Sequence, residues 1–112
     1  MRTKLVAMNI AATGAIALMG FGFQAQAADA QAERVYHQSL AATCANCHGT
    51  NGVSVAGNRI PKINELTHEQ IAQMLKQYKA GEKTGTIMPQ LAKGYTEQQI
   101  DIIAKVLGKP TK

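Results

Sequence analysis

The segment Cys44–His48, with the sequence CANCH, holds the side chains whose types and spacing indicate chemistry most clearly. Two thiols three positions apart, with a histidine directly after the second, form the attachment signature of c-type haem. One turn of chain brings both sulfurs to the vinyl groups of a porphyrin edge, and the imidazole then lies beneath the iron as an axial ligand. The sequence contains two cysteines in all, so the motif accounts for every thiol. We predict one covalent haem c held by Cys44 and Cys47, with His48 bound to its iron.

Three other interpretations of this motif are weaker. A thioredoxin-like redox pair lies near a βαβ pattern, and the sequence shows no such pattern. A zinc site needs four ligands, but the histidine downstream of His48, His68, lies far along the chain and has no second ligand beside it. A disulfide between Cys44 and Cys47 would close so short a loop that it would stabilise almost nothing.

The ligand on the other side of the iron decides what such a haem can do. Of the five methionines, only Met74 and Met88 lie beyond the apolar N-terminal stretch. Met74 lies in the apolar stripe of an expected helix, where methionine usually fills the core. Met88 precedes a proline, which favours an extended backbone, so we expect a loop that carries its thioether to the iron. The alternatives to Met88 are His37, His68 or an open position.

Ligation by His48 and Met88 would leave the iron no position for oxygen, peroxide or substrate. A thioether stabilises reduced iron and raises the potential. The expected task is therefore the transfer of single electrons, without catalysis by this chain itself. An open iron would instead indicate a ligand-binding or peroxidatic haem protein, and rapid carbon monoxide binding would distinguish the two.

Three helices are expected to position the motif and Met88. The first runs from Gln31 to about Thr43 and leads directly into the motif. The second starts after Thr67, which can form a capping box with Gln70, and ends at Gly81.

The third helix starts after Thr96, which can form a capping box with Gln99, and ends at Gly108. Residues 82–95, between the second and third helices, are expected to form an irregular loop that carries Met88.

Turn residues after His48 predict a loop without helical period. Gly49 is expected to let the backbone pass close to the porphyrin. The carbonyl of Pro61 is the candidate acceptor for the second ring N–H of His48, an interaction that fixes the tautomer of a ligating histidine. The alternative is that Pro61 only makes the loop rigid.

The start of the chain resembles a secretory signal peptide. Arg2 and Lys4 give a positive start, an apolar stretch follows, and residues 25–27 have the small-x-small pattern AQA of a cleavage site. We predict a cleaved signal of residues 1–27, one domain of residues 28–112 without a membrane span, and a periplasmic location. The alternative is an uncleaved membrane anchor. Because bacteria attach haem to protein thiols outside the cytoplasm, the signal and the haem motif support each other.

Composition points to a small domain that needs its cofactor. The net charge of the 112-residue chain is +5, but its lysines are scattered, which does not indicate nucleic-acid binding. There is no tryptophan, and both phenylalanines lie in the predicted signal, so Tyr36, Tyr78 and Tyr95 are the aromatic residues of the domain. Since so short a chain buries little surface, we expect the porphyrin to supply apolar bulk and the apoprotein to be largely unfolded.

With these residues in place, residues 28–112 resemble a class I c-type cytochrome. The resemblance implies an all-α fold of three main helices and loops around one covalent haem. It also implies that Cys44 and Cys47 attach the haem and that His48 and Met88 ligate its iron. In this family the first and last helices cross, which would place Tyr36 near the crossing.

The segment 86–96, with the sequence TIMPQLAKGYT, is similar to the methionine loop in the cytochrome subunit of flavocytochrome c sulfide dehydrogenases. This resemblance implies an FAD-containing sulfide dehydrogenase subunit as the partner and an electron-accepting role in sulfide oxidation. The alternative is a cytochrome that diffuses freely between respiratory complexes. Copurification with a yellow flavoprotein would favour the first role.

Overall fold

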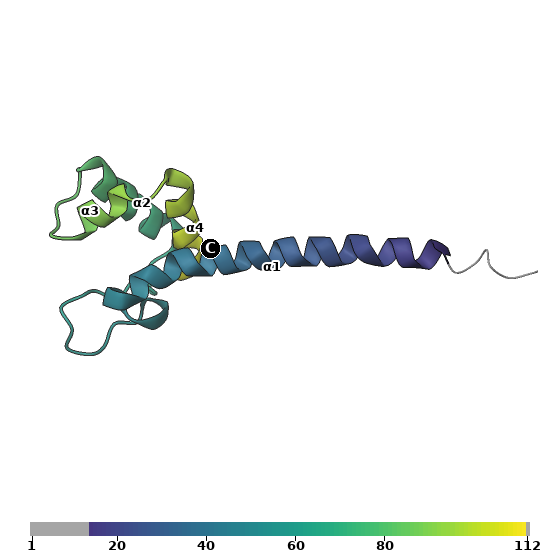
Figure 1. The fold of residues 1–112 in the computed structure, drawn as a ribbon. Coiled ribbons are helices and arrows are strands. Elements are labelled where there is room, and N and C mark those ends of the chain that lie inside the picture. Colours follow the sequence, from purple (N-terminus) through teal and green to yellow (C-terminus); the bar gives the residue numbers. More distant parts are fainter. Residues whose placement is uncertain (1–13, 112) are drawn as a thin grey trace, which may run out of the picture. The chain divides into compact units, whose positions relative to one another are not determined.

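The computed structural model describes residues 14–111, with side chains from residue 26 onward. These residues form α1 (Gly14–His48), the short 3-10 helix η1 (Thr50–Gly52), α2 (His68–Ala80), α3 (Met88–Lys93) and α4 (Glu97–Leu107), as Figure 1 shows. Within this part of the chain there is no strand, only an isolated parallel bridge between Thr67 and Lys109. The all-α prediction is confirmed.

The chain divides into two compact units, residues 1–33 and residues 34–112. In the first unit, residues 14–33 are helical, whereas Arg2, Lys4 and the start of the predicted signal lie outside the described residues. None of the helices described is both long enough and apolar enough to cross a membrane. The second unit contains the haem motif.

The first predicted helix is longer than expected at both ends, because α1 begins at Gly14 rather than Gln31 and continues through the haem motif to His48. Alanine is the best helix former, and the three alanines among residues 41–45 favour this continuation. The helix ends at Gly49, whose φ of 80° is a conformation that glycine adopts easily. The N–H of Gly49 still donates to the carbonyl of Ala45 at 3.0 Å. Both cysteines therefore lie on a regular helix.

The predicted boundaries of the next helix are confirmed. The Thr67 hydroxyl accepts a hydrogen bond from Gln70 N at 3.3 Å, and the Gln70 side chain accepts one from Thr67 N at 2.9 Å. These two bonds satisfy N–H groups that the first turn of a helix leaves unpaired. Gly81 ends α2 in the left-handed conformation, with φ 78°.

The last helix repeats this arrangement. The Thr96 hydroxyl accepts from Gln99 N at 3.1 Å, and the Gln99 side chain accepts from Thr96 N at 2.9 Å. The helix ends at Gly108, where an added Cβ would lie only 2.8 Å from His68 N. The glycine therefore lets the end of α4 lie against the start of α2.

One predicted loop contains a helix. Residues 88–93 form α3, with Met88 as its first residue and Pro89 in its first turn. The expectation that the proline holds Met88 in an extended loop is wrong. Proline has no N–H, but the first turn of a helix needs none, and its fixed φ suits that position.

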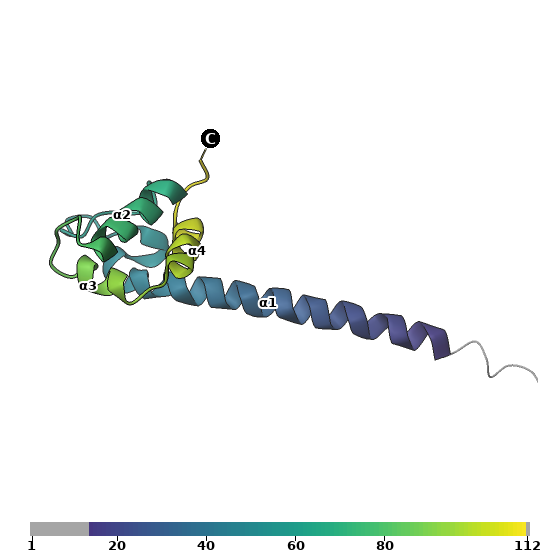
Figure 2. The same ribbon diagram turned by 90° about the horizontal axis from the view of Figure 1, so that it is seen from above.

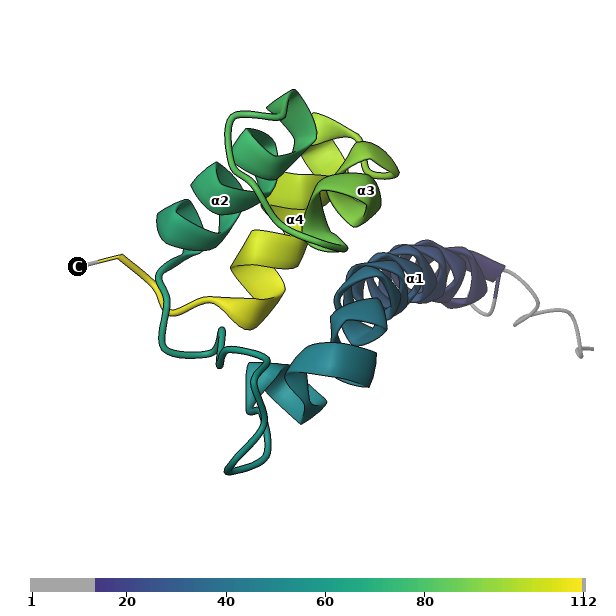
Figure 3. The same ribbon diagram turned by 90° about the vertical axis from the view of Figure 1, so that its left-hand side faces the viewer.

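The small core lies between α2, α3 and α4. Helix α2 packs against both α3 and α4, and Figures 2 and 3 show the three grouped together. Ile100 and Ile103 of α4 are fully buried, and Ile71 of α2 is nearly so. The other buried apolar residues among those described are alanines: Ala41, Ala92 and Ala104.

Two hydrogen bonds join the end of α1 to the chain around α4. Gln99 Nε2 donates to the Tyr36 hydroxyl at 3.3 Å, and the Tyr95 hydroxyl lies 2.8 Å from Thr43 Oγ1. Tyr36 thus contacts the last helix, near which the family resemblance placed it. The tyrosine side chain itself remains about half exposed.

Candidate haem site

The haem motif occupies the last turn of α1. Residues three and four positions apart share one face of a helix, so Cys44 lies on the same face as Cys47 and His48. Both cysteines are free thiols, with Cys44 half-buried and Cys47 exposed. Burial raises the pKa of the Cys44 thiol, and the neighbouring Cys47 adds to the rise. The thiols are therefore accessible from one side of the helix and are not engaged with each other.

The ring of His48 is held by the loop that follows it. His48 Nδ1 lies 2.8 Å from the carbonyl oxygen of Pro61. Since a carbonyl can only accept a hydrogen bond, Nδ1 carries the proton, and the lone pair is on Nε2. This is the tautomer of a histidine that binds a metal through Nε2, with its orientation set by the second nitrogen.

The loop from His48 to Pro61 begins with a tight turn, in which Gly52 N donates to the carbonyl of Gly49 at 2.9 Å. Gly52 is buried, and its carbonyl accepts hydrogen bonds from Ile63 N at 3.0 Å and from Asn64 N at 3.3 Å. A Cβ on Gly49 would lie 2.0 Å from the carbonyl oxygen of Val53. Gly49 is therefore required by the approach of the chain to itself, and the passage of this backbone along the porphyrin stays a prediction.

We predict that Gly49→Ala destabilises the holoprotein by more than about 3 kcal/mol, because a left-handed φ and a backbone collision act together. Gly57→Ala is a matched control, since Gly57 also has a positive φ, 84°, but no atom within 4 Å of an added Cβ. This control should lose only about 1 kcal/mol, the cost of the left-handed conformation. Thermal unfolding of both variants, followed by circular dichroism, measures the difference; equal losses would contradict the collision.

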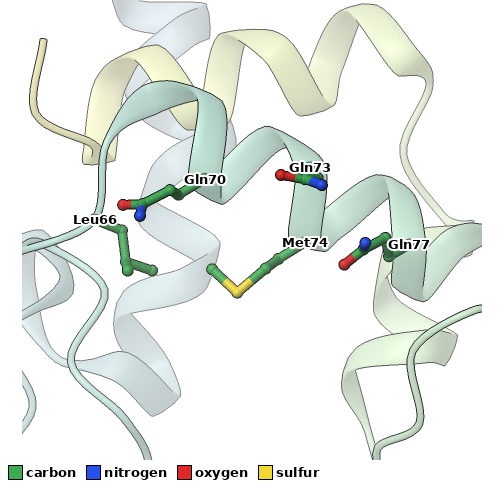
Figure 4. Close-up of a pocket in the computed structure, with 5 residues that line it drawn as sticks. All are labelled: Leu66, Gln70, Gln73, Met74 and Gln77. Atoms are coloured by element: carbon green, nitrogen blue, oxygen red, sulfur yellow. The ribbon is translucent and has the colours of Figure 1, made fainter. Parts of the chain in front are cut away.

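The two methionines lie on different helices. Met88 begins α3 and is partly exposed. Met74 lies on α2 and is not the buried core residue that its place in the apolar stripe predicted, because it lines an open pocket. Figure 4 shows Met74 and Leu66 pointing into this pocket, which three glutamines also line: Gln70, Gln73 and Gln77.

The residues present fit a haem. Two thiols, a histidine with a fixed tautomer and a partly exposed thioether provide both attachment and ligation chemistry. Large apolar side chains around the site are exposed in the polypeptide, among them Val55 at 75% and Ile87 at 60%. A porphyrin would cover such side chains and give this small domain the apolar contacts that its own residues do not provide.

The alternative of a zinc site finds no ligand set in the structure. Among the side chains described, no three histidines, cysteines, aspartates or glutamates lie together in a way that could hold a metal ion.

The helical fold and the CANCH motif at the end of α1 define a monohaem c-type cytochrome. Residues 27–105 match the protein family described as "Cytochrome C oxidase, cbb3-type, subunit III", and the chain therefore belongs to this family. The predicted haem c cofactor is confirmed by this membership.

Two characterised relatives are similar to the chain. The cytochrome subunit of sulfide dehydrogenase from Chlorobaculum tepidum is 41% identical over 73 residues, which are 65% of this chain and 64% of the relative. The thiosulfate dehydrogenase electron acceptor from Stutzerimonas stutzeri is 27% identical over 96 residues, which are 82% of this chain and 44% of the relative. The chain thus matches less than two thirds of the length of each. One name describes the cytochrome subunit of a dehydrogenase, and the other describes the electron acceptor of a dehydrogenase.

Sequence reasoning missed two hydrogen bonds of Tyr95, which connect it to α2 and to the residue of α1 that precedes the motif. Thr43 bonds to Tyr95, and Lys79 of α2 donates a hydrogen bond to the main-chain oxygen of Tyr95. No local pattern signals these pairs, because their members lie far apart in the sequence and none has a distinctive spacing.

Proposed function

We propose that the chain is a periplasmic one-electron carrier, the electron-accepting cytochrome subunit of a sulfide-oxidising flavocytochrome c. The observation that carries the proposed site is the His48–Pro61 hydrogen bond, which holds the histidine next to both thiols as a metal ligand. The sulfide-oxidising role is supported by the 41% identity to a subunit named for sulfide dehydrogenase. Its partner would be an FAD-containing subunit that oxidises sulfide.

Each site residue has a separate task in this proposal. Cys44 and Cys47 attach the haem through two thioethers, and His48 Nε2 and the Met88 sulfur ligate the iron. When bound, the haem supplies a ferric–ferrous couple. Pro61 keeps the imidazole oriented, and Met88 excludes water and small ligands from the iron. With His48 and Met88 both holding the iron, the haem would transfer electrons and would offer no position for substrate.

Export of the chain is also part of the proposal. We place the signal peptide at residues 1–27 and the cytochrome c domain at residues 28–112. The start of the family match at residue 27 supports this boundary. Mass spectrometry of the periplasmic protein tests it, with an N-terminus at Ala28 as the expected result.

The role as a subunit is tested by isolating the holoprotein with a C-terminal tag from the periplasm of its own host. We expect a yellow flavoprotein to copurify and sulfide to reduce the haem of the complex. Sulfide should not reduce the isolated cytochrome at a comparable rate. A cytochrome without a flavin partner, and without sulfide-dependent reduction in the periplasmic extract, would contradict this role.

A second candidate is a diffusible electron acceptor. It is supported by the relative named as an electron acceptor of thiosulfate dehydrogenase, whose match extends over 82% of this chain. Reduction of the monomeric cytochrome by a thiosulfate-oxidising fraction of the periplasm would favour this candidate.

A further inference from the structure

Tyr95, between α3 and α4, connects the methionine segment with two other helices. Its hydroxyl lies 2.8 Å from Thr43 Oγ1 of α1, and its main-chain oxygen accepts a hydrogen bond from Lys79 Nζ of α2. Its N–H donates to the carbonyl of Ala92 at 3.3 Å. Tyr95 is half-buried, and hydrogen bonds of both its main chain and its side chain hold it in place.

Each hydroxyl has a single proton, and this fixes which of Tyr95 and Thr43 donates the hydrogen bond between them. Thr43 Oγ1 donates its single proton to the carbonyl of Leu40, at 2.8 Å. The bond between the two hydroxyls must therefore be donated by Tyr95 and accepted by Thr43. A phenylalanine at position 95 would keep the ring and remove only this donor.

This bond spans the two parts of the proposed site. Thr43 directly precedes Cys44, so attachment of the haem fixes its position. On the other side, Tyr95 follows α3, a helix of six residues that begins with Met88 and whose Ala92 is completely buried. A short, anchored helix moves as one piece, so the position of Tyr95 affects the position of Met88.

We propose that Tyr95 is a positioning residue, whose hydrogen bond to Thr43 holds α3 so that the Met88 thioether stays on the iron. This inference rests on the proposed ligation by Met88. The loss of the bond would increase the fraction of molecules in which the thioether has left the iron. Added ligands would then bind more tightly, because they bind only those open molecules.

The test measures imidazole binding to the oxidised holoprotein of the variant Tyr95→Phe. A hydrogen bond of ordinary net strength predicts about fivefold tighter imidazole binding than in the wild type. The weak far-red absorption of a ferric iron–thioether bond should also be lost at a lower pH or temperature. Thr43→Val should have the same effect, Thr43→Ser should keep the wild-type affinity, and the double variant Tyr95→Phe with Thr43→Val should add nothing further.

Tyr36→Phe is the matched control. It removes another hydroxyl between α1 and α4, the acceptor for Gln99. Gln99 belongs to α4 and not to the segment of residues 88–95 that carries Met88. A purely structural effect of losing such a bond would appear in both variants, as lower thermal stability. Only Tyr95→Phe should tighten imidazole binding.

Two outcomes would overturn the inference: wild-type imidazole affinity in Tyr95→Phe, or an equal increase in Tyr36→Phe. A wrong assignment of Met88 as the iron ligand can be distinguished from a wrong role for Tyr95, because it would be visible in the wild-type protein itself. A wild-type protein without the far-red absorption, and with an iron open to imidazole, would reject Met88 as the ligand and this role of Tyr95 with it.

Discussion

The double variant Cys44→Ala with Cys47→Ala is expected to contain no covalent haem and to lose most of its helical circular dichroism. The reason lies in the composition of the core. The buried apolar residues that the structure describes are three isoleucines and three alanines. A fully buried isoleucine stabilises a fold by about 2–3 kcal/mol and an alanine by much less, whereas ordering each residue of the backbone costs about 1–2 kcal/mol. Without the porphyrin, so few contacts cannot hold the domain.

The measurement compares the variant with the wild type, both produced in a host that attaches haem. Mass spectrometry should show the added haem mass only in the wild type, and the variant should be colourless. The single variant Cys47→Ala keeps one thioether and should retain a coloured, less stable protein. A colourless double variant with wild-type helicity and a cooperative thermal transition would contradict the prediction.

The substitution Met88→Ala is expected to open the iron. The reduced variant should bind carbon monoxide rapidly, whereas the wild type should bind it slowly or not at all. Its potential should fall by on the order of 0.1 V, part of the roughly 0.8 V range over which axial ligands set haem potentials. The direction follows from the thioether, which stabilises the reduced iron.

Met74→Ala provides the control for this experiment. It removes the other thioether of the cytochrome domain, from the pocket on α2. We expect its carbon monoxide binding and its potential to remain close to those of the wild type. An unchanged potential and a closed iron in Met88→Ala would reject the ligand assignment, and an open iron in Met74→Ala would point to the other methionine.

The helices could be predicted largely from the sequence because their ends carry local chemical signals. Both capping boxes, at Thr67 and Thr96, depend on residues three positions apart, and the left-handed stop at Gly81 depends on one residue. The end of α1 was placed too early and α3 was missed. The end of the first helix was set by its apolar residues, which mark one face only as far as Thr43 or Cys44. Helix α3 was missed because proline was taken as a helix breaker, although proline is permitted in the first turn of a helix.

The haem site was predictable in its chemistry but not in its contacts. The spacing of Cys44, Cys47 and His48 indicates the cofactor without any structure. The close approach of Gly49 to Val53 could not be predicted, because it depends on how the loop returns. The bond between Thr43 and Tyr95 likewise depends on the packing of helices that are distant in sequence.

The exposed side chains of Val53, Val55, Ile87 and Leu91 have a consequence for how the cell handles newly made chains. Apolar surface of this kind, on a chain with so small a core, attracts proteases and promotes self-association. We therefore expect chains without attached haem to be degraded faster than chains that carry it. The steady-state amount of this cytochrome would accordingly follow the supply of haem to the maturation machinery more closely than the rate of translation.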